Sequence, residues 1–211
     1  MNTENLLETL TEAQVPFAVL GNNILGPWDS ERYDVVWMDD RAGAYELTQY
    51  LQGLGHEAIW FVGSRQFPTT RILEGYSDAM KEQKLKPHAI EIDSEDERDI
   101  GYMAAKSLFT RRTPVTAIFG YNDAVAHGVY DAARACGLKI PEDISIVGVG
   151  DRPEAKALSP ALTTVWAYPD QVGRRLAELV LHRIDNPDAP PQQVLLPTKL
   201  IKRNSCSKAA R

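Results

Sequence analysis

The sequence has little cysteine, a deficit of basic residues and no patterned metal ligands. Its two cysteines, Cys136 and Cys206, form neither a disulfide framework nor a metal-binding motif, which suits a reducing compartment. Lys and Arg number 23 against 29 Asp and Glu, giving a formal net charge of −6. Because contact with phosphates needs clustered Lys and Arg, this balance argues against a nucleic-acid surface on the chain.

Long apolar runs are also absent. No run approaches the roughly 18 residues of a membrane span, and the N-terminal stretch MNTENLLETLTEAQ is polar and acidic. We therefore expect neither a membrane anchor nor a secretory signal, and we predict a cytoplasmic protein. The 211 residues, 44% of them hydrophobic, suffice for one large or two modest domains.

No catalytic pattern stands out. Ser159 and Ser205 lie in no G-x-S-x-G motif, and GVGDRP departs from the dinucleotide fingerprint at Pro153. Asp39 and Asp40 could form a phosphotransferase or magnesium site, but capping of the following helix explains them better. The histidines lack metal-ligand spacing: His56, His88, His127 and His182. We expect no enzyme activity, no cofactor and no metal.

The chain alternates short apolar runs with amphipathic stretches, which is typical of a parallel sheet with crossover helices. The predicted strands are VPFAVLG, YDVVWM, AIWFVG, HAIEI, VTAIFG and ISIVGVG. The predicted helices span residues 3–13, 41–54, 69–84, 97–110, 122–136 and 170–184. The stretch SPALTTVWAY is predicted to be extended because it is rich in β-branched residues.

The last apolar run, QQVLLPTKLIKRNS, contains Pro197. Proline cannot donate to a strand ladder, so it indicates either an edge strand or a point where the chain leaves one sheet for another.

Asn122 directly follows the apolar run TAIFG and precedes a predicted helix. Ligands of parallel α/β sheets bind outside the carboxyl ends of the strands, so its amide could face a ligand there. Asn is also a favoured helix N-cap. The residue pattern alone leaves both interpretations open.

Five motifs occur in order from Tyr33 onward. They are YDVVWMDDRAGAYELTQYLQGLGHEAIWFVG, RILEGYSDAM, TAIFGYNDAVAHGVYDAARACGLKIPEDISIVGVGD, SPALTTV and LLPTKLIKRNS. Together they resemble the effector-binding core of LacI-family transcription regulators. The resemblance implies a two-lobed, periplasmic-binding-protein-like α/β fold, in which a small ligand in the cleft alters DNA affinity.

The resemblance also implies a domain organisation. Residues 1–38 plus 167–197 would form a partial N-terminal lobe, residues 39–165 plus 198–206 a complete C-terminal lobe, and residues 207–211 a tail. A DNA-binding headpiece and the first strand-helix units of the family have no counterpart here, so we expect an N-terminally shortened chain. Operator DNA would be bound only through that headpiece.

Candidate effector-binding residues follow from the resemblance. Asn122 matches the Asn of the family's ND motif, which contacts effector in many members. The usual arginine and first acid are replaced by Ile72 and Gly150, which leaves the ligand class open; a sugar or sugar derivative is one candidate. The remaining candidates for lining the cleft are Asp40, Phe67, Arg71, Trp166 and Tyr168.

A homodimer is expected from the same resemblance. The helix after the ND motif and the segment after GVGD would form its symmetric face, and Tyr130 would be either an aromatic anchor or ordinary helix packing. The predicted face comprises His127, Tyr130, Asp131, Arg134, Ala157 and Leu158. The alternative functions are a sugar-binding protein of a transport system and an enzyme that uses Asp39 and Asp40.

Overall fold

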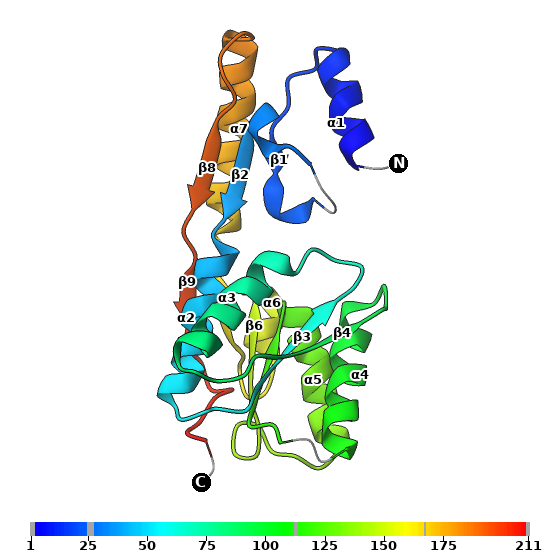
Figure 1. The fold of residues 1–211 in the computed structure, drawn as a ribbon, viewed down its shortest axis with the longest axis vertical. Helices are drawn as coiled ribbons and strands as arrows, with labels where there is room; N and C mark the ends of the chain where they lie inside the picture. Colours follow the sequence, from blue (N-terminus) through cyan, green and yellow to red (C-terminus); the bar gives the residue numbers. More distant parts are fainter. Residues whose placement is uncertain (1–2, 25–27, 112–113, 167, 210–211) are drawn as a thin grey trace. The chain divides into compact units, whose positions relative to one another are not determined.

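The computed structural model describes residues 3–24, 28–111, 114–166 and 168–209. The chain divides into two compact units, each built from separate segments. Unit 1 comprises Met1–Asp39 and Ala167–Pro197, and unit 2 comprises Asp40–Trp166 and Thr198–Arg211. Figure 1 shows both units and labels most of their elements.

Unit 2 is built on a six-stranded sheet with the order β4-β3-β5-β6-β7-β9. Its strands are β3 (Ile59–Ser64), β4 (His88–Ile92), β5 (Ala117–Gly120), β6 (Ser145–Val149), β7 (Thr163–Trp166) and β9 (Lys199–Ile201). Neighbouring strands are parallel except β9, which pairs antiparallel with β7 at the sheet edge.

Helices cover both faces of this sheet (Figure 1). They are α2 (Asp40–Gly53), α3 (Thr70–Glu82), α4 (Glu97–Thr110), α5 (Asp123–Ala135) and the short α6 (Pro153–Ala157). The chain steps outward from β3 to β4 and then back through β5 to β6. Because such crossovers are right-handed, α3 packs on the face opposite to that of α4 and α5.

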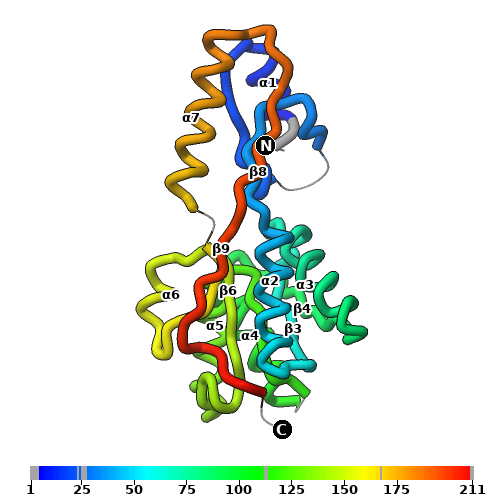
Figure 2. The backbone as a smooth tube through the Cα atoms, turned by 90° about the vertical axis from the view of Figure 1, so that its left-hand side faces the viewer, coloured from blue at the N-terminus to red at the C-terminus, as the bar shows by residue number. Residues whose placement is uncertain are grey.

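Unit 1 has a three-stranded parallel sheet with the order β1-β2-β8. Its strands are β1 (Val19–Leu20), β2 (Val35–Met38) and β8 (Gln193–Leu196), and its helices are α1 (Thr3–Glu12) and α7 (Pro169–Asp185). Two short 3-10 helices, Gly21–Asn23 and Ser30–Arg32, connect β1 to β2. Figure 2 shows α7 running along the strands of this unit.

The cores of the two units differ in continuity. Unit 2 contains one cluster of buried side chains that includes Phe61, Tyr76 and Phe119. Unit 1 has two clusters, because neighbouring residues of β2 point to opposite faces. Val35 packs with Leu7 and Tyr33, whereas Val36 packs with Val172 and Leu179 of α7.

The α/β class with parallel sheets flanked by helices, predicted from the sequence, is confirmed. Strand His88–Ile92 and helix Glu97–Thr110 have the predicted bounds. Pro197 separates β8 from β9, which lie in different sheets, so the chain does leave one sheet for another there.

The predicted local structure differs from the observed one at three places. Only Val19 and Leu20 of the run VPFAVLG form a strand. The stretch SPALTTVWAY, predicted to be extended, contains strand Thr163–Trp166, but Tyr168 at its end has a left-handed φ of 47°. Helix α6 was not predicted, since five residues are too few to show a helical period. Within the described part of the chain, no helix is long and apolar enough to cross a membrane.

Candidate functional site

The carboxyl ends of β3, β5 and β6 carry the polar residues that form the candidate site of unit 2. Asn122 follows β5, Asp151 and Arg152 follow β6, and Phe67 lies in the turn after β3. Carboxyl ends of parallel strands meet at one edge of a sheet, which is where ligands of open α/β sheets bind.

Asn122 is the N-cap of α5 and also donates to a neighbouring carboxylate. Its Oδ1 accepts from the Val125 N–H at 2.9 Å, and its Nδ2 donates to Glu97 Oε1 at 2.6 Å. The side chain is 8% exposed. The cap therefore uses only the amide oxygen, and the NH₂ group donates to the Glu97 carboxylate. Contact of that NH₂ group with a ligand stays a prediction.

Glu97, the first residue of α4, accepts hydrogen bonds from three side chains. Its Oε1 also accepts from the Tyr121 hydroxyl at 3.1 Å, and its Oε2 accepts from Arg152 Nη1 at 3.0 Å. Asp96 caps α4 through the Arg98 and Asp99 N–H groups, which places Glu97 in the first helical turn. No motif in the sequence marked Glu97, and only its place after a strand could have suggested it.

Asp123 lies beneath this group and is fully buried. Its Oδ1 accepts from the Thr164 hydroxyl at 2.6 Å, and its Oδ2 accepts from the Arg152 N–H at 2.7 Å. Burial raises the pKa of the Asp123 carboxyl to about 6, against the lowering effect of those two hydrogen bonds. Asp123 thereby joins the start of α5 to β7 and to the loop after β6.

Gly148 makes room for the Asp123 carboxylate. A Cβ at this position would lie 2.6 Å from Asp123 Oδ1, closer than van der Waals contact allows. The glycines of GVGD therefore serve the packing of Asp123 and the turn at Gly150, whose φ of 129° favours glycine.

Asp151 ties the loop after β6 to the C-terminal segment. Its carboxylate accepts from Arg203 Nη2 and lies 3.7 Å from Lys156 Nζ. Arg203 also donates to the Leu162 carbonyl at 2.8 Å. The segment of residues 203–205 therefore has a structural role. Its Ser205 hydroxyl donates a buried hydrogen bond to the Ile146 carbonyl at 2.6 Å.

Phe67 is held beside Tyr121. The Ser64 hydroxyl accepts from the N–H groups of Gln66 at 3.0 Å and Phe67 at 3.2 Å, which shapes the turn after β3. The rings of Phe67 and Tyr121 then stack, with centroids 6.4 Å apart. An aromatic face thus adjoins Glu97, whose carboxylate raises the pKa of the Tyr121 hydroxyl together with burial, the larger cause.

The other predicted effector residues lie on separate elements. Asp40 begins α2 and is nearly buried, and Arg71 is exposed in the first turn of α3. Trp166 ends β7 in unit 2, whereas Tyr168 in unit 1 precedes α7 with a left-handed φ of 47°. For these four residues, as for Asn122 and Phe67, ligand contact stays a prediction.

The predicted dimer face is only partly on the surface of unit 2. Tyr130 is fully buried and donates to the Pro160 carbonyl at 2.9 Å, and Leu158 is 8% exposed. Tyr130 is therefore ordinary helix packing and not an exposed anchor. His127 and Asp131 are half-buried, and Arg134 and Ala157 are exposed. Asp131 accepts from Arg98 Nε at 2.6 Å, and Arg134 donates to the Ser159 carbonyl at 3.1 Å.

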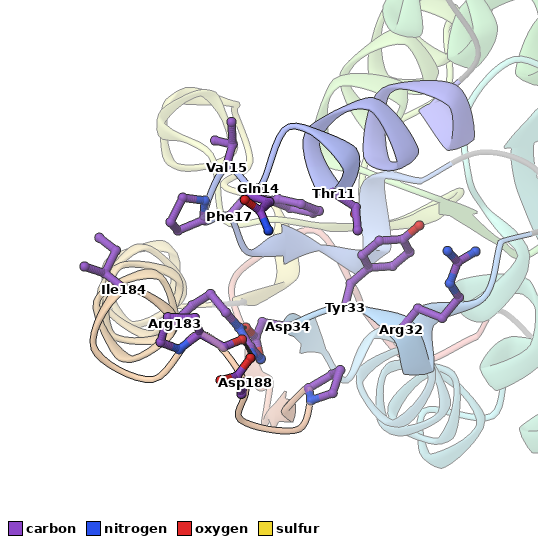
Figure 3. Close-up of a pocket in the computed structure, with 13 residues that line it drawn as sticks. Thr11, Gln14, Val15, Phe17, Arg32, Tyr33, Asp34, Arg183, Ile184 and Asp188 are labelled. Atoms are coloured by element: carbon purple, nitrogen blue, oxygen red, sulfur yellow. Dashed lines mark hydrogen bonds and ion pairs between the residues drawn. The ribbon is translucent and has the colours of Figure 1, made fainter.

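A cavity of about 410 Å³ lies in unit 1, near the amino ends of its strands (Figure 3). Its most buried polar group, Asp34, accepts from Arg183 Nε at 2.9 Å and from the Gln192 N–H at 2.8 Å. Arg183 also donates to the carbonyls of Pro187, Ala189 and Pro190. These groups stabilise the loop before β8, so their role is structural.

Among the described residues, no group of three or more His, Cys, Asp or Glu side chains could hold a metal ion. Asp39 and Asp40 are therefore not part of such a group in the regions that the structure covers.

Comparison with known proteins gives the family. The model of the periplasmic binding protein-like domain matches residues 48–206, and the chain belongs to this family. The ribose operon repressor of Haemophilus influenzae is 32% identical over 176 residues, which are 82% of this chain and 53% of the repressor. The chain spans about half the length of the curated relatives it matches.

Solved structures agree with this assignment. A LacI family transcriptional regulator from Enterococcus faecium with bound ribose superposes with a TM-score of 0.87 at 27% identity, covering 99% of this chain and 76% of that one. A complex of the transcriptional regulator CelR with cellobiose gives 0.84 at 27% identity, covering 95% and 62%. The predicted resemblance to the effector-binding core of LacI-family regulators is confirmed.

Proposed function

We propose that this chain senses a small-molecule effector for a LacI-type transcription regulator and binds it at the carboxyl edge of the unit 2 sheet. The observation that carries the proposal is the group formed by Asn122, Glu97 and Arg152, which Glu97 joins to Tyr121, whose ring stacks on that of Phe67. Amide, carboxylate and guanidinium groups next to an aromatic face suit a sugar, whose hydroxyls donate and accept while its ring stacks.

The relatives support a sugar or sugar derivative as the effector. Ribose is bound in the Enterococcus faecium regulator, and cellobiose is bound in CelR. The ribose operon repressors of Haemophilus influenzae and Escherichia coli are among the relatives, which favours a regulator over the alternative, a sugar-binding protein of a transport system. We infer a cytoplasmic, non-enzymatic role on the same grounds.

The experiment is a thermal-shift screen with D-ribose and cellobiose on the wild type and on Asn122→Ser. Serine caps helices about as well as asparagine, so the variant keeps the cap but loses the amide NH₂. A ligand at a hundred times its dissociation constant stabilises the wild type by about 2.7 kcal/mol. We expect Asn122→Ser to lose most of that stabilisation while its unliganded stability stays within about 1 kcal/mol.

Asn122→Ala is the matched variant that removes cap and amide together, and it should lose about 1 kcal/mol in the absence of ligand. A sugar that stabilises Asn122→Ser as much as the wild type would show that Asn122 acts only as a helix cap.

We also propose that the chain forms a homodimer through the exposed part of the predicted face, which includes Arg134 and Ala157. In sedimentation velocity, Ala157→Arg should shift the protein toward monomer because it adds a charged side chain to the face, whereas Glu57→Arg on another exposed segment should not. A wild-type monomer at high micromolar concentration would refute the dimer.

Operator DNA would be contacted by residues that this chain does not supply. The formal net charge of −6 disfavours contact with phosphates. We expect no sequence-specific electrophoretic shift with the 211-residue chain at moderate salt, and such a shift would overturn this part of the proposal.

A further inference from the structure

Glu97 occupies a central position at the candidate site. Its carboxylate accepts from Tyr121, Asn122 and Arg152, which come from the ends of two different strands. The Glu97 side chain is 24% exposed and that of Arg152 is 45% exposed, so both reach solvent. An anion that is this accessible can exchange its internal donors for donors of a ligand.

Arg152 is already paired with Glu97. The Arg152 guanidinium lies 3.0 Å from Glu97 Oε2, while its backbone N–H is taken by Asp123. Asp151, the next acid along the edge, is paired with Arg203 and lies near Lys156. The Arg152 guanidinium is the part of that residue that could attract an anion, and the Glu97 carboxylate lies next to it. An incoming anion would therefore be repelled by Glu97.

We propose that Glu97 is a specificity-determining residue of this site, which accepts hydroxyl groups of neutral, polyhydroxylated ligands and excludes their phosphorylated forms. This inference rests on the proposed effector-binding function. Sugar hydroxyls donate to a carboxylate and accept from an amide or guanidinium, so a neutral sugar can replace each internal bond of Glu97. A phosphate group brings negative charge and strong acceptor oxygens to the same carboxylate, which is itself an anionic acceptor.

The proposal is tested by titrating the full chain with D-ribose, cellobiose, ribose 5-phosphate and inorganic phosphate, using calorimetry. The variants are Glu97→Gln, which removes the charge, and Glu97→Asp, which keeps it. The matched control is Glu95→Gln, because Glu95 is an exposed acid two residues earlier and the charge change is the same. Melting curves verify that each variant folds.

We expect the wild type to bind a neutral sugar of the panel and to bind neither phosphate compound measurably. Glu97→Gln should bind that sugar at least about tenfold more weakly, the loss expected for a charge-assisted hydrogen bond. It should also gain at least about tenfold in affinity for inorganic phosphate, because Arg152 loses its internal anion. The further change Arg152→Gln should abolish this gain, and Glu95→Gln should behave as the wild type.

The outcomes separate this inference from the proposed function. If a neutral sugar binds the wild type and Glu97→Gln equally well, the role of Glu97 is refuted and the effector function stands. If ribose 5-phosphate binds the wild type more tightly than ribose, the inference is also refuted. If neither sugar binds the wild type, the proposed sugar effector fails. The gain of phosphate binding in Glu97→Gln, relative to Glu95→Gln, then still supports or refutes exclusion of anions by Glu97.

Discussion

The two units share an α/β architecture but differ in the size of their hydrophobic cores. The buried side chains of unit 2, which has six strands, form one continuous cluster. Those of unit 1, which has three strands, form two small clusters. Unit 1 also contains eleven Asp or Glu residues against four Lys or Arg, in a chain whose net charge is −6. The excess of acid therefore lies in unit 1, and unit 2 is close to neutral.

This difference indicates that the two units are stabilised by different interactions. Unit 2 relies on apolar packing across a wide sheet, and its buried polar groups are available to build a site. Unit 1 has smaller apolar clusters, so we expect its stability to depend more on keeping the buried Asp34 carboxylate paired with Arg183.

The largest expected effect is the loss of a core side chain in unit 2. Phe61 is fully buried and contacts the rings of Tyr76 and Phe119, with centroids 5.6 Å away in both cases. Phe61→Ala should destabilise unit 2 by about 3–5 kcal/mol, because it removes buried apolar area and leaves a cavity. Urea unfolding followed by tryptophan fluorescence measures it, and a loss under about 1 kcal/mol would contradict a continuous core.

The corresponding test in unit 1 is the buried ion pair. The Asp34 side chain is 2% exposed, and Arg183 is 18% exposed. Arg183→Ala should cost about 3 kcal/mol because it leaves a buried carboxylate without its partner. The control is Arg174→Ala, an exposed position on the same helix. Equal urea midpoints for the two variants would show that unit 1 does not depend on this pair.

The pH dependence of stability sharpens the comparison at Asp123. Its folded-state pKa of about 6 lies above the usual 3.8, so the folded state holds the proton more tightly than the unfolded state. The contribution of Asp123 is therefore most favourable below pH 4 and declines as the pH rises to about 6, by no more than about 3 kcal/mol.

Asp123→Asn removes this titration, so the stability difference between wild type and variant should change with pH only in that window. Unfolding free energies measured from pH 4 to pH 7 report it. The single amide oxygen of the variant can still accept from the Arg152 N–H, but its NH₂ group then faces the Thr164 hydroxyl, which must change from donor to acceptor. Any cost of this exchange is the same at every pH. A difference that is flat across the window would contradict the raised pKa of Asp123.

The smallest effect is expected at exposed ion pairs in either unit. Arg175 and Glu178 of α7 are 2.5 Å apart, and their side chains are about half exposed. Arg98 and Asp131 are similarly placed on unit 2 at 2.6 Å. Arg175→Ala and Arg98→Ala should each change the unfolding free energy by less than about 1 kcal/mol. A larger loss at Arg98 would indicate that the α4–α5 packing depends on the pair.

The sequence determined the elements whose signals are local. Helix Glu97–Thr110 and strand His88–Ile92 have the predicted bounds because capping, periodicity and β-branched content act within a few residues. Pro197 likewise marked the change of sheet, since a proline has no N–H for a ladder. The Asn122 position at a strand end was also readable from the sequence, although the choice between cap and ligand contact was not.

Only the tertiary structure decided which side chains meet. Glu97 lies 25 residues before Asn122 and 55 before Arg152, and the crossing of α4 back to β5 brings the three together. The same holds for Tyr130, for which the sequence left an interface anchor and helix packing open, and which is buried with its hydroxyl donating to the Pro160 carbonyl. It also holds for Gly148, whose missing side chain leaves room for the Asp123 carboxylate. Such contacts depend on how strands and helices pack against one another. They join residues far apart in the chain, so no local sequence pattern predicts them.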